Sequence, residues 1–395
     1  MSLFQKKKRE YDTKAPKCVR CGLFKNCDSP KMFLEGKGQK DILVVVEQVT
    51  GSQDKAGDLY SSSSIKYLED YLYDFGIDLK EDCYLAPALA CNSESNVPDV
   101  SIKYCRPHIF NTIKQKKPKL VLLFGIKAVK SVIGKGFTSS IDSINKWRGF
   151  VIPGIEHNAW FAPQFPIRYY SDNMYPGYDI VIRNDLENAL SYLNKPVPKK
   201  RNDDEAVAIL TDIDSIVRLL VDINKQEPKH LSFDYETNML NPYSKEAKVY
   251  TVGLCYERKR AYSFPLYSKV VPEFLTILNN PKIGKIAHNI QMEDKWTHTL
   301  YMLEVKNWIA DTMNIAHILD NRSKVTSLDF QVYMNFGIPP YNEHIKEYLR
   351  SPNPNTPNRI DKINKMDLLL YGGKDALYTH RLFLKQQQIL KQIGE

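Results

Sequence analysis

The chain has 395 residues, 43% of them hydrophobic, and a formal net charge of +9. A chain of this length and composition is expected to form two or three domains with buried cores, which excludes disorder over most of its length. The positive charge favours an acidic partner, most often nucleic acid, although a basic surface can also serve solubility alone. Residues 1–10 are polar and basic, unlike a signal peptide, and the longest apolar runs have the length of strands. We therefore expect a cytoplasmic protein with no membrane partner.

Strand-like and helical patterns alternate through the first half of the chain. Short apolar runs predict strands at residues 41–48, 83–91, 119–125, 148–154 and 159–165. Amphipathic stretches predict helices at residues 65–76, 100–115, 126–134 and 185–195. Such alternation is typical of a mainly parallel sheet with helices on both faces. We therefore expect an α/β domain at residues 1–194.

A segment rich in proline and charge, KPVPKKRNDDE, follows at residues 195–205 and is predicted to be a linker. Residues 206–395 are expected to form a second domain. It begins with an amphipathic helix at residues 213–225, followed by three strand-like runs that indicate a meander rather than βαβ units. These runs are residues 231–237, 248–257 and 260–267. The remainder is expected to be mostly helical, interrupted by the strand-like residues 285–290.

Two acidic residues, Asp234 and Glu236, lie within the first run of this meander. Side chains at positions i and i+2 of a strand point to the same face, so the two carboxylates project together. Adjacent carboxylates repel each other unless a cation lies between them. Mg²⁺ and Mn²⁺ prefer such oxygen ligands, and the pair therefore predicts a metal site. The alternative is an acidic pair facing solvent on an edge strand.

Further acidic residues follow in a fixed order along the second half. Glu293 and Asp294 come just after a predicted strand-to-helix junction. Tyr371 and Asp375 are four residues apart on a predicted helix and share one of its faces. Each of these signals alone is weak, because an acidic residue on a helix is usually just solvated. Their order, from the acidic pair to a tyrosine and an aspartate, makes a common site the stronger interpretation.

Residues 205–395 resemble, in this order of motifs, the 3′–5′ proofreading exonuclease domain of family A DNA polymerases. The segment that begins at Asp311, DTMNIAHILDNRSKVTSLDFQ, also matches that family between its second and third motifs. The resemblance implies an RNase H-like fold and hydrolysis of phosphodiesters with two Mg²⁺ or Mn²⁺ ions. The implied substrate is a single-stranded or frayed 3′ DNA end.

The same resemblance assigns roles to individual residues. It implies that Asp234 and Asp375 bind the metals and that Glu236 is a further ligand or orients the attacking water. It implies that Tyr371 helps to position that water. The second motif departs from the family, which has an aspartate four residues after its asparagine.

In this chain Asn289 is followed at that spacing by Glu293, with Asp294 one residue later. Neighbouring residues on a helix point about 100° apart, so only one of the two acids is expected to face the metals. The register favours Glu293, whereas the chemical identity of the family's residue favours Asp294. We favour Glu293 and leave Asp294 as the alternative.

The chain has seven cysteines, and in a reducing compartment they favour metal ligands or free thiols over disulfides. Cys18 and Cys21 form a CVRC motif, and Cys91 and Cys105 lie far downstream. Four thiolates can hold zinc or an iron–sulfur cluster. A zinc ribbon would have two CxxC knuckles rather than one. Cys27 remains a competing ligand, and the two downstream cysteines could instead be buried thiols.

Residues 15–194 resemble the family 4 uracil-DNA glycosylases, which carry a [4Fe-4S] cluster. CVRCGLF matches the start of that family, and the segment from Glu47 to Tyr60 aligns without a gap with its glycine-rich first motif. The segment that begins at Cys105 matches the one after the fourth cluster ligand. The resemblance implies a glycosylase-like fold and a cluster held by Cys18, Cys21, Cys91 and Cys105, with zinc as the alternative.

The catalytic pattern of that family is damaged in this chain. Its first motif is rich in glycine where residues 48–50 read QVT, and this bulk hinders the approach of a flipped base. The asparagine that would bind the base falls at Pro87, and the histidine of a later motif falls at Ala162. An alanine cannot stabilise charge on a leaving uracil. The residues that keep plausible roles are Glu47, Asp54 and Tyr60.

The leading hypothesis is a metal-dependent 3′–5′ DNA exonuclease with an attached, degenerate glycosylase-like domain that contacts DNA. This pair of domains resembles the N-terminal part of certain bacteriophage family A polymerases. A polymerase domain or subunit is therefore an expected partner, and the host cytoplasm an expected location. The alternatives are an active uracil-DNA glycosylase and a non-catalytic DNA-binding module of a replisome.

Overall fold

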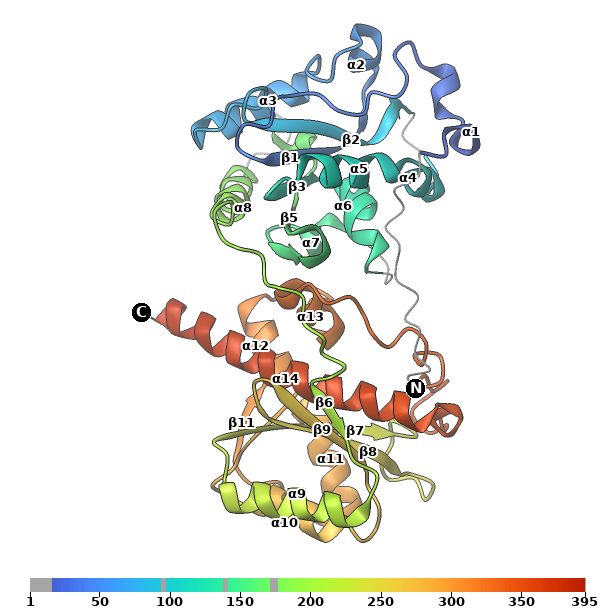
Figure 1. Cartoon of the computed structure of the whole chain (residues 1–395), viewed down its shortest axis with the longest axis vertical. Helices are drawn as coiled ribbons and strands as arrows, with labels where there is room; N and C mark the ends of the chain where they lie inside the picture. The colour runs from blue at the N-terminus through green and yellow to red at the C-terminus, as the bar shows by residue number, and fades with distance from the viewer. Residues whose placement is uncertain (1–15, 94–96, 138–140, 171–176, 395) are drawn as a thin grey trace. The chain divides into compact units, whose positions relative to one another are not determined.

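The computed structural model describes residues 16–93, 97–137, 141–170 and 177–394 (Figure 1). The basic segment at residues 1–10 lies outside these ranges. The chain divides into two compact units, Met1–Lys200 and Arg201–Glu395, and their boundary falls inside the predicted linker. Among the described residues, no helix combines the length and the apolar character that a membrane span requires.

A five-stranded sheet forms the centre of the first unit. The strands lie in the order β2-β1-β3-β5-β4, and all neighbours are parallel except β4, which runs antiparallel to β5. The strands are β1 (Ile42–Val49), β2 (Cys83–Asn92), β3 (Leu120–Phe124), β4 (Ile152–Gly154) and β5 (Ala159–Gln164). All five residues of β3 are buried, as expected for a strand covered on both faces. The predicted, mainly parallel sheet is confirmed.

Helices cover both faces of this sheet. They are α1 (Cys18–Cys21), α2 (Gly51–Ala56), α3 (Ser63–Asp74), α4 (Asp99–Cys105), α5 (Pro107–Lys116), α6 (Ile126–Val132), α7 (Ile144–Trp147) and α8 (Asp179–Leu190). Short 3-10 turns are η1 (Leu23–Asn26), η2 (Ile133–Lys135), η3 (Ile155–His157) and η4 (Ile167–Tyr170). The single helix expected at residues 100–115 is two helices, α4 and α5. The chain breaks at Arg106 because Pro107 has no N–H to donate and starts a new helix.

The second unit contains a six-stranded mixed sheet in the order β11-β10-β7-β8-β9-β6. The strands are β6 (Val207–Ile209), β7 (His230–Thr237), β8 (Val249–Glu257), β9 (Arg260–Pro265), β10 (Gly284–Ala287) and β11 (Trp308–Asp311). The meander β7-β8-β9 is antiparallel, and β10 and β11 run parallel to β7. This is the RNase H-like arrangement that the resemblance implies, and the predicted meander is confirmed. The short strands β6 and β11 were not expected from the sequence.

The helices of this unit are α9 (Ile213–Gln226), α10 (Val271–Asn279), α11 (Ile290–Tyr301), α12 (Thr312–Leu319), α13 (Leu328–Phe336) and α14 (Lys365–Gly394), with the turn η5 (Ile360–Lys362). Helices α9, α10 and α11 lie on one face of the sheet, and α14 crosses the other (Figure 1). Both faces of β7 therefore lie beneath helices. Its apolar side chains pack against α9, α10 and α11, and its acidic side chains point to the face that α14 crosses.

Three glycines let α14 lie directly on the sheet. A Cβ on Gly253 of β8 would collide with the backbone carbonyl of Gly372 on α14. A Cβ on Gly373 would collide with Val207 of β6 and lie 3.1 Å from the Cβ of Ser263 on β9. The two glycines inside the helix are therefore explained by close helix–sheet packing, which offsets their low helix propensity.

A buried ionic cluster fastens the start of the second unit to α14. Arg381 donates to Asp203 over 2.7 Å, and the hydroxyl of Tyr378 donates to the other oxygen of Asp203 over 2.8 Å. Asp203 and Arg381 are both less than a tenth exposed, so the pair is shielded from water. Asp203 lies within the predicted linker, whose last residues therefore belong to the packed second unit and hold the helix that carries Tyr371 and Asp375.

Candidate functional site

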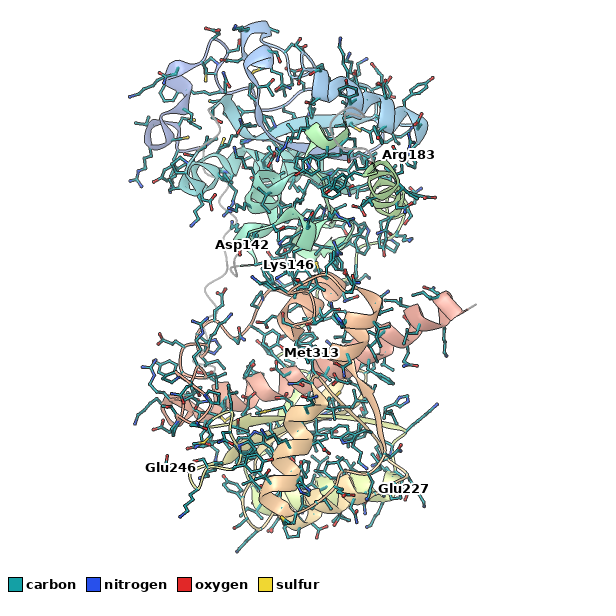
Figure 2. The ribbon with its side chains drawn as sticks, turned by 180° about the vertical axis from the view of Figure 1, so that it is seen from behind. Asp142, Lys146, Arg183, Glu227, Glu246 and Met313 are labelled. Atoms are coloured by element: carbon teal, nitrogen blue, oxygen red, sulfur yellow. The ribbon has the colours of Figure 1, made fainter. Side chains whose placement is uncertain are left out.

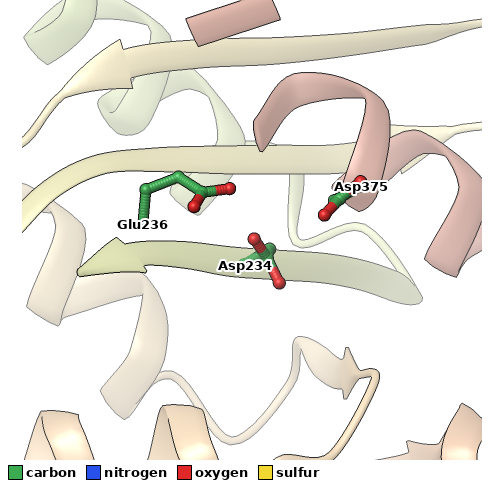
Figure 3. Close-up of side chains that lie close together, drawn as sticks. All are labelled: Asp234, Glu236 and Asp375. Carbon is green, nitrogen blue, oxygen red and sulfur yellow. The ribbon is translucent and has the colours of Figure 1, made fainter. Parts of the chain in front are cut away.

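Three carboxylates converge between β7 and α14. Asp234 and Glu236 project from β7, and Asp375 faces them from α14 (Figure 3). One oxygen of each lies within 4.8 Å of the others. The alternation of the strand puts the first two on one face, and the glycine contacts of α14 bring the third close enough.

Burial and mutual repulsion dominate the electrostatics of this cluster. Burial raises the pKa of Asp234 to about 7. The pKa values of Glu236 and Asp375 are raised well above their ordinary range, first by burial and then by the charge of Asp234. Three ionised carboxylates so close together are costly unless cations lie between them. The alternative of a solvent-facing acidic pair on an edge strand does not fit, because Glu236 is buried and β7 lies between β10 and β8.

The residues Glu293 and Asp294 face different surroundings on α11. Glu293 is 2% exposed, its Oε2 has no hydrogen-bond partner, and the charge of Asp234 raises its pKa after burial itself. Asp294 instead accepts a hydrogen bond of 3.0 Å from the indole of Trp308 on β11. The structure therefore places Glu293 on the side of the cluster and gives Asp294 a partner elsewhere.

Two tyrosines flank Asp375. Tyr371 lies one turn earlier on α14, and the nearby charges of Asp375, Glu236 and Asp234 add to burial in raising its pKa. Tyr341, in the connection after α13, donates its hydroxyl to Oδ1 of Asp375. Sequence reasoning missed Tyr341, since it lies 34 residues from its partner in a segment without periodicity.

Asp311 fixes the position of α11. Its carboxylate accepts from the backbone N–H groups of Asn289 and Ile290, each over 3.0 Å, and also caps α12. Asn289 adopts a positive φ of 84°, which starts the helix abruptly after β10. This clamp sets the direction in which Glu293 points. It also gives a structural role to Asp311, the first residue of the segment that matches the exonuclease family.

The donor set of the cluster suits hard divalent cations. All its groups are carboxylate oxygens, the ligands that Mg²⁺ and Mn²⁺ prefer, and neither sulfur nor imidazole is among them. Oε2 of Glu293 is buried without a hydrogen-bond partner, and nearby carboxylates add to burial in raising the pKa of Glu293. The residues present therefore fit a metal site.

Comparison with known proteins agrees with this geometry. The sequence model of a family described as "3'-5' exonuclease" matches residues 207–391. The C-terminal half is a 3′–5′ exonuclease domain. A search of curated proteins found no match.

The chain is also similar to solved nuclease structures, each over less than half of its length. Brucella melitensis NrnC with bound Mg²⁺ is 17% identical over 48% of this chain and 81% of its own, with a TM-score of 0.35. Escherichia coli RNase D is 13% identical over 46% of this chain and 45% of its own, with a TM-score of 0.36. Trypanosoma brucei RNase D in complex with RNA U12 is 11% identical over 45% of this chain and 60% of its own, with a TM-score of 0.36.

The four cysteines singled out in the first unit line one pocket. Cys18 and Cys21 form α1, Cys91 lies at the end of β2, and Cys105 ends α4. The walls between them are largely apolar and include Leu23, Phe24, Phe33, Leu89 and Tyr104. Burial raises the pKa of Cys91 to about 11 and that of Cys105 to about 12. Cys27 donates to the carbonyls of Leu23 and Asn92 and does not line the pocket.

The spacing of these sulfurs bears on the kind of metal. Among the described residues, no three cysteine sulfurs lie within 4.8 Å of one another. Around a tetrahedral zinc with bonds of about 2.3 Å, the sulfurs would be about 3.8 Å apart.

Of the glycosylase-like positions, Glu47 lies near the carboxyl end of a parallel strand. Glu47, at the end of β1, accepts from the guanidinium of Arg168 over 3.1 Å and from the backbone N–H of Lys127 over 3.3 Å. Its side chain also packs against Gly125, where any Cβ would collide with it. Glu47 is thus held by partners within its own unit.

The remaining positions of this set are buried, except Tyr60, which is partly buried. Asp54 accepts from the backbone N–H groups of Asp28 and Ser29, so it supports the loop after η1. The hydroxyl of Tyr60 is buried without a partner. Pro87 and Ala162 lie inside β2 and β5, paired with β1 and β3. Neither offers a polar side chain, as the sequence indicates.

Proposed function

We propose that this protein is a metal-dependent 3′–5′ DNA exonuclease of the proofreading type. The observation that carries the proposal is the convergence of Asp234, Glu236 and Asp375 inside a domain of the 3′–5′ exonuclease family. Oxygen-only sites of this kind serve phosphodiester hydrolysis with two metal ions.

Each residue has a part in the proposed mechanism. Asp234 and Asp375 hold the metals from opposite sides of the site, and Glu236 completes the ligands or orients the attacking water. Tyr371 positions that water, and Glu293, rather than Asp294, is the fourth acidic residue. When bound, the two metal ions supply stabilisation of the attacking and leaving oxygens of an in-line displacement at phosphorus.

The charge distribution supports a DNA-contacting role for the first unit. Residues 1–200 carry 30 lysines and arginines against 22 aspartates and glutamates, a net charge of +8. Residues 201–395 carry 25 against 24, a net charge of +1. Contacts with phosphates depend on such an excess, so the first unit holds DNA while the second cuts it. The resemblance to phage polymerases further supports a polymerase as the partner.

A [4Fe-4S] cluster held by Cys18, Cys21, Cys91 and Cys105 is part of the proposal. It is supported by the pocket that the four cysteines share and by the resemblance of residues 15–194 to the family 4 uracil-DNA glycosylases. Protein purified without oxygen should be brown and contain about four irons per chain. A colourless protein with one zinc per chain would overturn the cluster.

The experiment for the activity uses a 5′-labelled single strand that contains one uracil, incubated with Mg²⁺ and then with EDTA. A ladder shortened from the 3′ end, dependent on metal and lost in Asp234→Ala, supports the exonuclease. A matched RNA strand tests the preference for DNA. An abasic product that forms in EDTA would indicate a glycosylase instead, and binding without any product would indicate a non-catalytic module.

A matched pair of variants tests the fourth acid. Glu293→Gln should abolish most of the activity, because it removes a charge that faces Asp234. Asp294→Asn keeps an acceptor for Trp308 and should retain activity. The opposite result would assign Asp294 to the metals.

A further inference from the structure

An open cleft lies beyond the end of β7, next to the carboxylate cluster. Its cavity volume is about 730 Å³, and it is partly open to solvent. This volume lies within the range of about 300–1,000 Å³ that is usual for pockets of single small ligands. The cleft is therefore large enough for a nucleotide-sized group, and its open side leaves room for a longer chain to continue beyond it.

The lining of the cleft combines aromatic rings with basic side chains. Tyr250, Tyr267 and Tyr301 line it, and each is part exposed. The ammonium of Lys365 lies 2.7 Å from the hydroxyl of Tyr267, and that of Lys248 lies 5.0 Å from the ring centre of Tyr250. Rings beside ammonium groups can stack bases and attract phosphates at the same time.

The acidic group of the lining does not cancel this positive charge. Asp361 is paired with Lys362 at 3.1 Å and not with either lysine of the cleft. Neither Lys248 nor Lys365 is ion-paired with Asp361, so a polyanion can approach both lysines without displacing that acid.

Both walls of the cleft are hydrogen-bonded to the residues that follow Glu236. One wall is formed by residues 247–251, and Asn238 holds it by accepting from the backbone N–H of Lys248 over 2.8 Å. Figure 2 labels Glu246 in the same connection, and the carbonyl of this residue accepts from the amide of Asn238. The other wall is formed by lining residues between Ile360 and Leu368. Just before it, Asn358 donates to the carbonyl of Thr237 over 3.0 Å. The cleft is thus built onto the strand that carries two of the three carboxylates.

The floor of the cleft lies next to the carboxylates. Thr251 lines the cleft and pairs with Glu236 across β7 and β8. It is 3% exposed, and its hydroxyl has no hydrogen-bond partner. Leu368, which also lines the cleft, lies one turn before Gly372, where an added Cβ would lie 3.3 Å from Glu236 and 3.7 Å from Thr251. The cleft is therefore adjacent to the carboxylates, although none of the three lines it.

We propose that this cleft binds the single-stranded DNA next to the bond that is cut, with bases stacked on Tyr250 and Tyr267 and phosphates near Lys248 and Lys365. The proposal rests on the proposed exonuclease function and adds to it the path of the strand. The protein then selects unpaired ends, because a base can stack on these tyrosines only after it has left the duplex.

The experiment is photocrosslinking of the full chain in EDTA, where no cleavage occurs. The probe is a dT12 strand that carries one 5-iododeoxyuridine at each of the last six positions in turn, since this base links to nearby aromatic rings on irradiation. Crosslinks should map to Tyr250, Tyr267 or Tyr301 for positions close to the 3′ end. Crosslinks from those positions that map only outside the cleft, or no crosslink at all, would overturn the proposal.

A kinetic measurement complements the crosslinking. The double variant Tyr250→Leu/Tyr267→Leu should raise the KM for dT12 about fivefold or more, because stacking on one ring contributes roughly 1–3 kcal/mol. The matched control is Tyr262→Leu with Lys259→Gln, a part-exposed tyrosine and an exposed lysine at the far end of β8 and β9, and its KM should not change.

The two proposals fail in different ways. If the protein does not cleave DNA, the crosslinks still test the cleft. If the protein cleaves DNA but the double variant and the control have the KM of the wild type, the exonuclease stands and the cleft is not the path of the strand. If a peptide partner occupied the cleft instead, DNA would crosslink elsewhere.

Discussion

The substitution Asp234→Asn tests the electrostatics of the carboxylate cluster through stability rather than activity. In an unfolded chain an aspartate has a pKa of about 3.9, whereas burial raises the pKa of Asp234 to about 7. The folded protein therefore binds more protons than the unfolded chain between these pH values, and the free energy of unfolding falls as the pH rises through them. A shift of about three pKa units lowers the free energy of unfolding at pH 8 by about 4 kcal/mol, which is an upper limit because solvent screens part of the charge.

Removing this charge should stabilise the metal-free protein at high pH. In EDTA at pH 8, Asp234→Asn is expected to melt above the wild type, by roughly 2–4 °C for each kcal/mol gained. At pH 5 the difference should shrink, because Asp234 is then mostly protonated. Mg²⁺ should raise the melting temperature of the wild type at pH 8 and have little effect on the variant.

Thermal melting followed by circular dichroism measures both effects, with Asp294→Asn as the control. Asp294 bonds to Trp308 and faces away from the cluster, so its substitution should not stabilise the protein. The reasoning is refuted if Asp234→Asn melts below the wild type at pH 8 in EDTA. It is also refuted if the difference between them is the same at pH 5 and pH 8.

Three further predictions concern single contacts. Gly373→Ala should lower the free energy of unfolding by about 1–3 kcal/mol in urea melts, since the new Cβ collides with Val207, and an unchanged stability would contradict the close packing. Tyr341→Phe removes a hydrogen bond that lowers the pKa of Asp375, so the acid limb of the pH–rate profile should move to higher pH; an unmoved limb would show that the bond is absent in solution. Asp54→Ala leaves two backbone N–H groups without their acceptor and should destabilise the first unit by about 1–3 kcal/mol by calorimetry, whereas a neutral effect would mean that water replaces the carboxylate.

The sequence predicted those parts of the fold that repeat a simple period. The parallel strands of the first unit and the meander of the second are runs of alternating or continuous apolar residues, which local sequence reveals. Strand β6 escaped because Val207–Ile209 has only three residues and is stabilised by pairing with β9. Strand β11 escaped because three of its four residues are not fully buried.

The candidate site could be predicted only where a motif and a period coincide. Asp234 and Glu236 share a face by the geometry of any strand, and Tyr371 and Asp375 share one by the geometry of any helix. The different surroundings of Glu293 and Asp294 could be seen only in three dimensions, since they depend on the clamp that Asp311 makes at the start of α11. Tyr341 reaches the site from an irregular connection, where no local pattern indicates which side chain turns inward.

The glycine contacts between α14 and the sheet also bear on how the exonuclease domain opens. With no side chain between Gly253 and Gly372, the helix and the strand touch through their backbones, and neither can shift without breaking the contact. Fluctuations that free the first turns of α14 must therefore also loosen β8, so these elements are expected to exchange their amide protons as one cooperative unit. Asp234 and Asp375 lie on opposite sides of this contact between helix and sheet. A metal ion bound to both would then be released when the whole contact opens, rather than when one ligand moves alone.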